Sequence, residues 1–170
     1  MVLVIMLLTL YGAARSQTED SLVHEGIVNA SAEQVWAAFT TKEGIESWMA
    51  AHAAVDFKLG GTMRIQYDAK GTVDDDKAIH NTIISYEPMR MLSFKVSKAP
   101  AAFPFANAIK NMWTVVYFEA LPDKTTRVRV VSLGFGNDEQ SKKMRDFFNR
   151  GNAFTLQRLQ KRFAPKTDAK

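Results

Sequence analysis

Between residues 54 and 133 the chain contains six short runs in which apolar and polar residues alternate, and most of the breaks between them are only a few residues long. Alternation with a period of two is typical of β-strands that bury one face. Strands joined by short turns pair antiparallel, because a parallel neighbour needs a crossover of a dozen or more residues. With an earlier run, the sequence predicts seven antiparallel strands, at residues 22–29, 54–59, 62–68, 78–86, 91–96, 112–120 and 126–133.

Two short helices are expected directly after the first strand. Ser31 followed by Gln34 has the spacing of a capping box, in which two side chains satisfy free N–H groups at the start of a helix. Thr40 and Glu43 repeat this spacing, which predicts a second helix that ends near Trp48.

A long helix is expected near the C-terminus, from about residue 138 to residue 163, with Asn137 as its cap. Phe148, Leu156 and Leu159 fall on one face of this helix. A sheet whose apolar face packs against one long helix is a common α+β arrangement. The expected fold class is therefore α+β, with a curved seven-stranded antiparallel sheet around the long C-terminal helix and the two short helices after the first strand.

Several segments have the character of a known family; these are residues 30–36, 40–48, 57–64, 86–92 and 118–135. Near the C-terminus, Gly151, Leu156 and Leu159 keep the spacing of a Gly-Trp motif with two later leucines, and Asn152 stands in place of the Trp. In these segments the chain resembles the SRPBCC superfamily of START-like, helix-grip proteins, within it the branch named for the activator of the ninety-kilodalton heat-shock chaperone's ATPase. The resemblance implies a cavity for apolar ligands between the sheet and the C-terminal helix.

Residues 1–16 have features of a secretory signal peptide. Residues 2–14 form an apolar run, and Ala14-Arg15-Ser16 places small residues at both positions that a signal peptidase reads. The run is too short to span a membrane, which needs roughly 20 apolar residues. We expect a single domain at residues 17–170, without a stable membrane span after processing, in the periplasm or secreted. The apolar run follows Met1 directly, without the Lys or Arg that usually precedes it in a signal peptide. Two alternatives therefore stay open. One is an uncleaved anchor, and the other is a mis-assigned start, which would make the protein cytoplasmic.

Residue types exclude several kinds of chemistry. The chain has no cysteine, which removes disulfides, thiol nucleophiles and cysteine-ligated metals. His24, His52 and His80 are too far apart in sequence for a zinc motif, and residues 74–76, three aspartates, lack the alternation of a calcium loop. No nucleophile elbow or phosphate loop is present. We therefore expect no metal and no cofactor. The 22 basic residues are scattered among 18 acidic ones, which argues against a nucleic-acid partner.

The cavity residues follow from the alternation, on the condition that no bulge reverses it. The expected ligand-binding residues are Met63, Ile65, Tyr67, His80, Thr82, Ile84, Phe94, Thr114 and Val116 from the strands, and Phe148, Asn152 and Leu156 from the helix. Apolar pockets with a few convergent polar groups are typical of small-molecule sites. Each polar member has the alternative role of satisfying a hydrogen bond inside the core.

The sequence thus favours an exported protein that binds a small apolar or amphipathic molecule and is not an enzyme. One alternative is a cyclase or dehydratase that uses the same cavity, with His80 or Tyr67 as acid or base. The other, implied by the resemblance, is a chaperone-interacting module, which requires that the leader is not a true signal.

Overall fold

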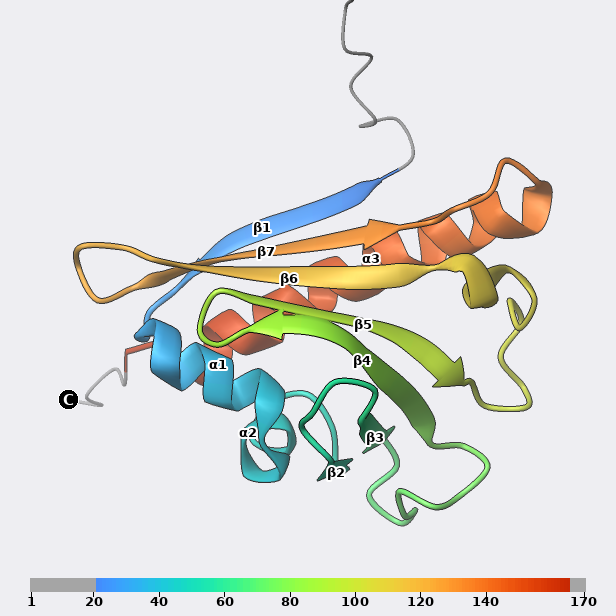
Figure 1. Cartoon of the computed structure of the whole chain (residues 1–170), viewed down its shortest axis with the longest axis horizontal. Helices are drawn as coiled ribbons and strands as arrows, with labels where there is room; N and C mark the ends of the chain where they lie inside the picture. Colours follow the sequence, from blue (N-terminus) through green and yellow to red (C-terminus); the bar gives the residue numbers. More distant parts are fainter. Residues whose placement is uncertain (1–20, 166–170) are drawn as a thin grey trace, which may run out of the picture.

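The computed structural model describes residues 21–165, and the expected signal peptide lies outside this range. The elements follow the predicted order: β1 (Leu22–Val28), α1 (Ala32–Thr40), α2 (Lys42–Glu46), β2 (His52–Val55), β3 (Thr62–Gln66), β4 (Ile79–Glu87), β5 (Met91–Lys98), the 3-10 turn η1 (Ala108–Asn111), β6 (Trp113–Ala120), β7 (Thr126–Leu133) and α3 (Glu139–Arg162). The strands form one seven-stranded antiparallel sheet in the order β1-β7-β6-β5-β4-β3-β2 (Figure 1). The predicted fold class is confirmed.

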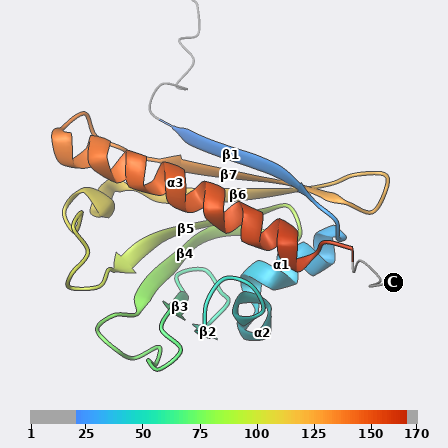
Figure 2. The ribbon, with the colours of Figure 1, turned by 180° about the vertical axis from the view of Figure 1, so that it is seen from behind.

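Helix α3 lies against the inner face of the curved sheet, as both views of the ribbon show (Figures 1 and 2). Leu156 and Leu159 are buried against the core. Burial of each such side chain contributes about 2 kcal/mol. At the β1 edge, Nε2 of Gln160 donates a hydrogen bond to the Ile27 carbonyl over 3.0 Å. The apolar face predicted for this helix therefore packs as expected.

Two helices begin one residue later than the sequence predicts. Thr41, and not Thr40, caps α2, because its Oγ1 accepts the N–H of Gly44. Asp138, and not Asn137, caps α3. In both places two neighbouring residues are able to cap, and the side chain that reaches the N–H three residues ahead is the cap. Ser31 caps α1 in the predicted capping box.

The second strand is also shifted from its expected position at residues 54–59. Residues 56–61 form a turn instead, in which Gly60 has a φ of +72°. This left-handed conformation suits glycine, because other side chains adopt it at a steric cost. The turn is closed by a hydrogen bond from the Gly61 N–H to the Lys58 carbonyl.

The core consists of three apolar clusters beneath the sheet. The largest joins α1 and α3 to the middle strands through residues such as Val35, Phe39, Leu92, Val116 and Leu159. A second lies under the loop after β5 and contains Ile109, Met112 and Met144, and a third packs Ile45 of α2 against Ile65 of β3. No helix within residues 21–165 has the length and apolar character needed to cross a membrane.

Candidate ligand-binding cavity

A cavity of about 460 Å³ lies between the inner face of the sheet and α3. Its wall takes residues from all three core clusters, including Phe39, Met63, Ile65, Met112 and Leu159. Cavities of this size and mainly apolar lining are typical of small-molecule sites.

The structure brings together nine of the twelve residues expected at the cavity. These are Met63, Ile65, Tyr67, Phe94, Thr114, Val116, Phe148, Asn152 and Leu156. The other three, His80, Thr82 and Ile84, are all on β4 and do not line it. The prediction was wrong for the facing of this one strand.

Two irregularities in β4 explain the error. Ile83 pairs with Phe94 of β5 while Ser85 pairs with Ser93, so Ile84 is an extra residue in the ladder. A second register shift lies earlier in the same strand, between His80 and Asn81. Because a bulge reverses the facing of the residues beyond it, Tyr86 packs inward but Ile84, two residues earlier, does not.

Ile84, 44% exposed, is on the outer face of the sheet. There it borders a shallow hollow with Trp113 and Tyr117. Thr82 pairs with Thr62, and His80 with Arg64, on the same outer face. Nε2 of His80 is buried without a hydrogen-bond partner among the described residues.

Asn81 lines the cavity in place of its neighbours His80 and Thr82. On the sheet its cross-strand partners are Met63 on β3 and Val96 on β5, and all three line the cavity. Ile79 and Ile83, two residues away on either side, are the sequence signal for this facing, since both are apolar and lie on the same face of the strand as Asn81.

A polar group on the opposite wall joins α3 to the sheet. Nδ2 of Asn152 donates a hydrogen bond to Oγ of Ser132, which is fully buried. Thr114 is the cross-strand partner of Ser132 and also lines the cavity.

Beside Asn152, a Cβ added to Gly151 would meet no atom within 4 Å. The glycine therefore leaves open space and does not serve close packing.

Tyr67 lies at the rim of the cavity. It is 56% exposed, and part of that surface faces the cavity that it lines. Withdrawal from bulk water raises the pKa of its phenol, and the nearby charge of Arg158 opposes this shift. The phenol therefore stays protonated at neutral pH.

Aromatic residues close the end of the cavity under the loop after β5. Phe103 from this loop stacks edge-on against Phe147 of α3 at 5.9 Å between ring centroids. Phe147 meets Phe148 in the same way at 5.5 Å. All three line the cavity, so the loop after β5 forms part of its wall.

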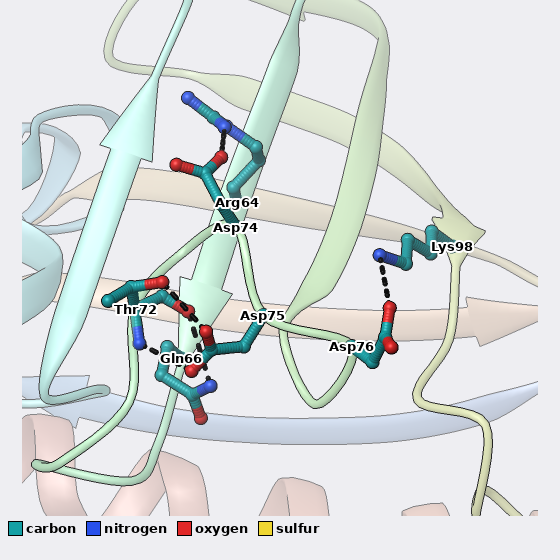
Figure 3. A network of polar contacts seen from close by, with 7 residues as sticks. All are labelled: Arg64, Gln66, Thr72, Asp74, Asp75, Asp76 and Lys98. Carbon is teal, nitrogen blue, oxygen red and sulfur yellow. Dashed lines mark hydrogen bonds and ion pairs between the residues drawn. The ribbon is translucent and has the colours of Figure 1, made fainter.

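The three aspartates at residues 74–76 have separate partners (Figure 3). Asp74 pairs with Arg64, Asp76 pairs with Lys98, and Asp75 accepts hydrogen bonds from Thr72. They therefore act as turn and surface residues. Within the described part of the chain, no group of three or more histidine, aspartate or glutamate residues is arranged to hold a metal ion.

Solved structures of similar fold extend these observations. A protein from Mesorhizobium loti matches with a TM-score of 0.67 at 18% identity, over 86% of this chain and 98% of that chain. The Aha1 dimer from Colwellia psychrerythraea matches with 0.66 at 15% identity, over 84% and 95%. CalU16 from Micromonospora echinospora matches with 0.61 at 16% identity, over 86% and 77%. At these identities the likeness shows the fold.

No curated protein sequence matches the chain. The family comparison, in contrast, covers most of it and agrees with the helix-grip architecture described above. Residues 29–164 match the family described as Activator of Hsp90 ATPase homolog 1-like protein, so the resemblance seen in the sequence is confirmed and the chain belongs to this family.

Proposed function

We propose that this protein binds a small apolar or amphipathic molecule in the cavity between the sheet and α3. The observation that carries the proposal is the cavity itself, about 460 Å³ of mainly apolar space within an otherwise packed core. Protein interiors are packed as densely as organic crystals, so a gap of this size calls for a use. Gly151 supports the same conclusion, because a helix-interior glycine costs roughly 1 kcal/mol relative to alanine and here leaves that space open.

The comparisons are compatible with this function. DynU16, a protein in the dynemicin biosynthetic locus, shares the fold with a TM-score of 0.62 at 16% identity. Its occurrence there supports a role for this fold in handling small organic molecules.

Binding without catalysis fits the cavity better than the cyclase or dehydratase alternative. That alternative relied on His80 or Tyr67 as acid or base. His80 is on the outer face of the sheet and does not reach a molecule held inside. The raised pKa of Tyr67 keeps its phenol protonated, so it could act only as an acid, without His80 in reach as the base.

We further propose that residues 1–16 direct export and are then removed. The support is in the sequence: an apolar run at residues 2–14 followed by Ala14-Arg15-Ser16. The protein would then meet its ligand outside the cytoplasm.

The binding function is tested with an uncharged fluorescent probe, N-phenylnaphthylamine, whose emission rises in an apolar site. We expect saturable binding with one site per chain, and native mass spectrometry of protein from its natural host should reveal a bound small molecule that organic solvent removes. A protein that neither carries a ligand nor binds the probe contradicts the proposal.

A further inference from the structure

We infer that Asn81 is the polar anchor of the cavity, and that the ligand is an uncharged amphipathic molecule with a group that both donates and accepts hydrogen bonds, of which a hydroxyl is the simplest. The inference rests on the proposed binding function and names the chemistry that the same cavity selects.

The anchor role follows from the surroundings of Asn81. The residue is only 5% exposed, and it lines the cavity between Met63 and Val96. No side-chain hydrogen bond joins its amide to any residue between Ser21 and Pro165. Buried polar side chains are almost always paired. An amide aimed into an apolar cavity without a protein partner is therefore suited to a partner that enters the cavity.

The other asparagine in the wall does not fill this role. Asn152 already donates from its Nδ2 to Ser132, and that bond fixes its orientation. The amide of Asn81 has its N–H₂ donors and its carbonyl acceptor free among the described residues. A hydroxyl group satisfies both kinds of group at once.

The charge of the wall argues against an anionic ligand deep in the cavity. Lys95 belongs to the lining, but it is exposed and alternates with Phe94 and Val96, which pack inward, so this alternation assigns its side chain to the outer face of the sheet. Arg158 is near Tyr67 at the exposed rim, and its guanidinium donates to the Met49 carbonyl. A carboxylate beside Asn81 would be desolvated without a cation to pair with it, which is costly.

The test measures displacement of N-phenylnaphthylamine at neutral pH by naphthol, naphthalene and naphthoate, which share one ring system. Wild-type protein should bind naphthol about tenfold more tightly than naphthalene, the value of one additional hydrogen bond. Naphthoate should bind more weakly than naphthol. In Asn81→Leu, which keeps the size of the side chain and removes the amide, naphthol should lose its tenfold advantage while naphthalene binds at least as well as before.

Thr82→Val is the matched control. It changes the next residue of the same strand, whose side chain belongs to the outer face, so the preference for naphthol should be unchanged. If circular dichroism shows that Asn81→Leu does not fold, Asn81→Ser takes its place in the displacement assay. Its preference for naphthol over naphthalene is then compared with that of wild-type protein.

The outcomes separate this inference from the function on which it rests. If wild-type protein binds no probe and none of the naphthalene compounds, the binding function itself is wrong. If it binds naphthalene and naphthol equally, Asn81 is satisfied in some other way and the anchor role is wrong while binding stands. Tightest binding of naphthoate, lost in Arg158→Gln, would move the polar contact to the rim and overturn the inference.

Discussion

Nδ2 of Asn152 on α3 donates a hydrogen bond to Oγ of Ser132 on β7 over 3.1 Å, and this bond crosses the wall of the cavity. Ser132 is fully buried, so its hydroxyl depends on this partner for satisfaction within the described structure. Asn152 thus has two effects. It leaves space inside, and it fixes the helix to the sheet at that point.

Restoring the aromatic side chain should close the cavity. In Asn152→Trp we expect binding of N-phenylnaphthylamine to be lost, because the indole occupies the space that the probe needs. Leaving the buried hydroxyl of Ser132 without its partner costs about 1–3 kcal/mol, which is small against a typical stability of about 5–15 kcal/mol, so the variant should stay folded. Probe titration and circular dichroism measure the two expectations.

Gln157→Trp is the control for this variant, since it places the same side chain at an exposed position of the same helix. Its affinity for the probe should equal that of wild type. Unchanged probe binding in Asn152→Trp would show that the ligand lies elsewhere.

Two helical glycines should respond in opposite ways to alanine. Gly151→Ala should raise the free energy of unfolding by about 1 kcal/mol and the melting temperature by about 3 °C, because the new methyl group meets nothing within 4 Å and alanine favours the helix. Gly44→Ala should destabilise, because its Cβ would lie 2.0 Å from the Ala37 carbonyl oxygen. Thermal unfolding measures both. A destabilised Gly151→Ala would mean that α3 packs more closely at this point than the structure shows.

Export gives a prediction that does not depend on the cavity. Cleavage after Ser16 should leave Gln17 as the first residue of the protein isolated from its natural host. N-terminal sequencing or intact mass measurement decides this, with Ala14→Arg as a variant whose processing should be impaired. Full-length chain recovered from the soluble cytosolic fraction would contradict export.

The sequence predicts the sheet better than it predicts the wall of the cavity. Alternation and turn residues predict seven strands in the right order and displace only the second, because the pattern of a half-buried antiparallel strand is local. The facing of β4 depends on where the ladder gains a residue, and Ile84 is that residue. Nothing in its identity marks a bulge, so alternation extended from Tyr86 through Ile84 selected His80 and Thr82 and missed Asn81.

The caps show the same limit on a smaller scale. Thr40 and Thr41 are both suitable N-cap residues, as are Asn137 and Asp138. Thr40 is still within α1, where its hydroxyl donates to the Trp36 carbonyl, so Thr41 caps the next helix. This choice depends on where the preceding element ends, which local spacing does not specify.

The cap of α3 should make stability depend on pH. The hydroxyl of Ser141 donates to one carboxylate oxygen of Asp138 over 2.6 Å, and its N–H donates to the other over 3.0 Å. These bonds lower the pKa of Asp138 below its ordinary value of 3.8. Because the folded pKa lies below the unfolded one, the charged cap stabilises the protein above about pH 4, and this contribution is lost as the pH falls through the folded value.

Asp138→Asn isolates this contribution, because asparagine still caps a helix but does not titrate. The difference in free energy of unfolding between wild type and variant, from urea titrations, should be constant above about pH 5 and should shrink below about pH 4. Other acidic groups titrate in both proteins and cancel in the difference. In Ser141→Ala, which removes the hydroxyl that lowers the pKa most, the pH dependence assigned to Asp138 should become smaller. A difference that stays constant down to about pH 2 would show that the Asp138 charge does not stabilise α3.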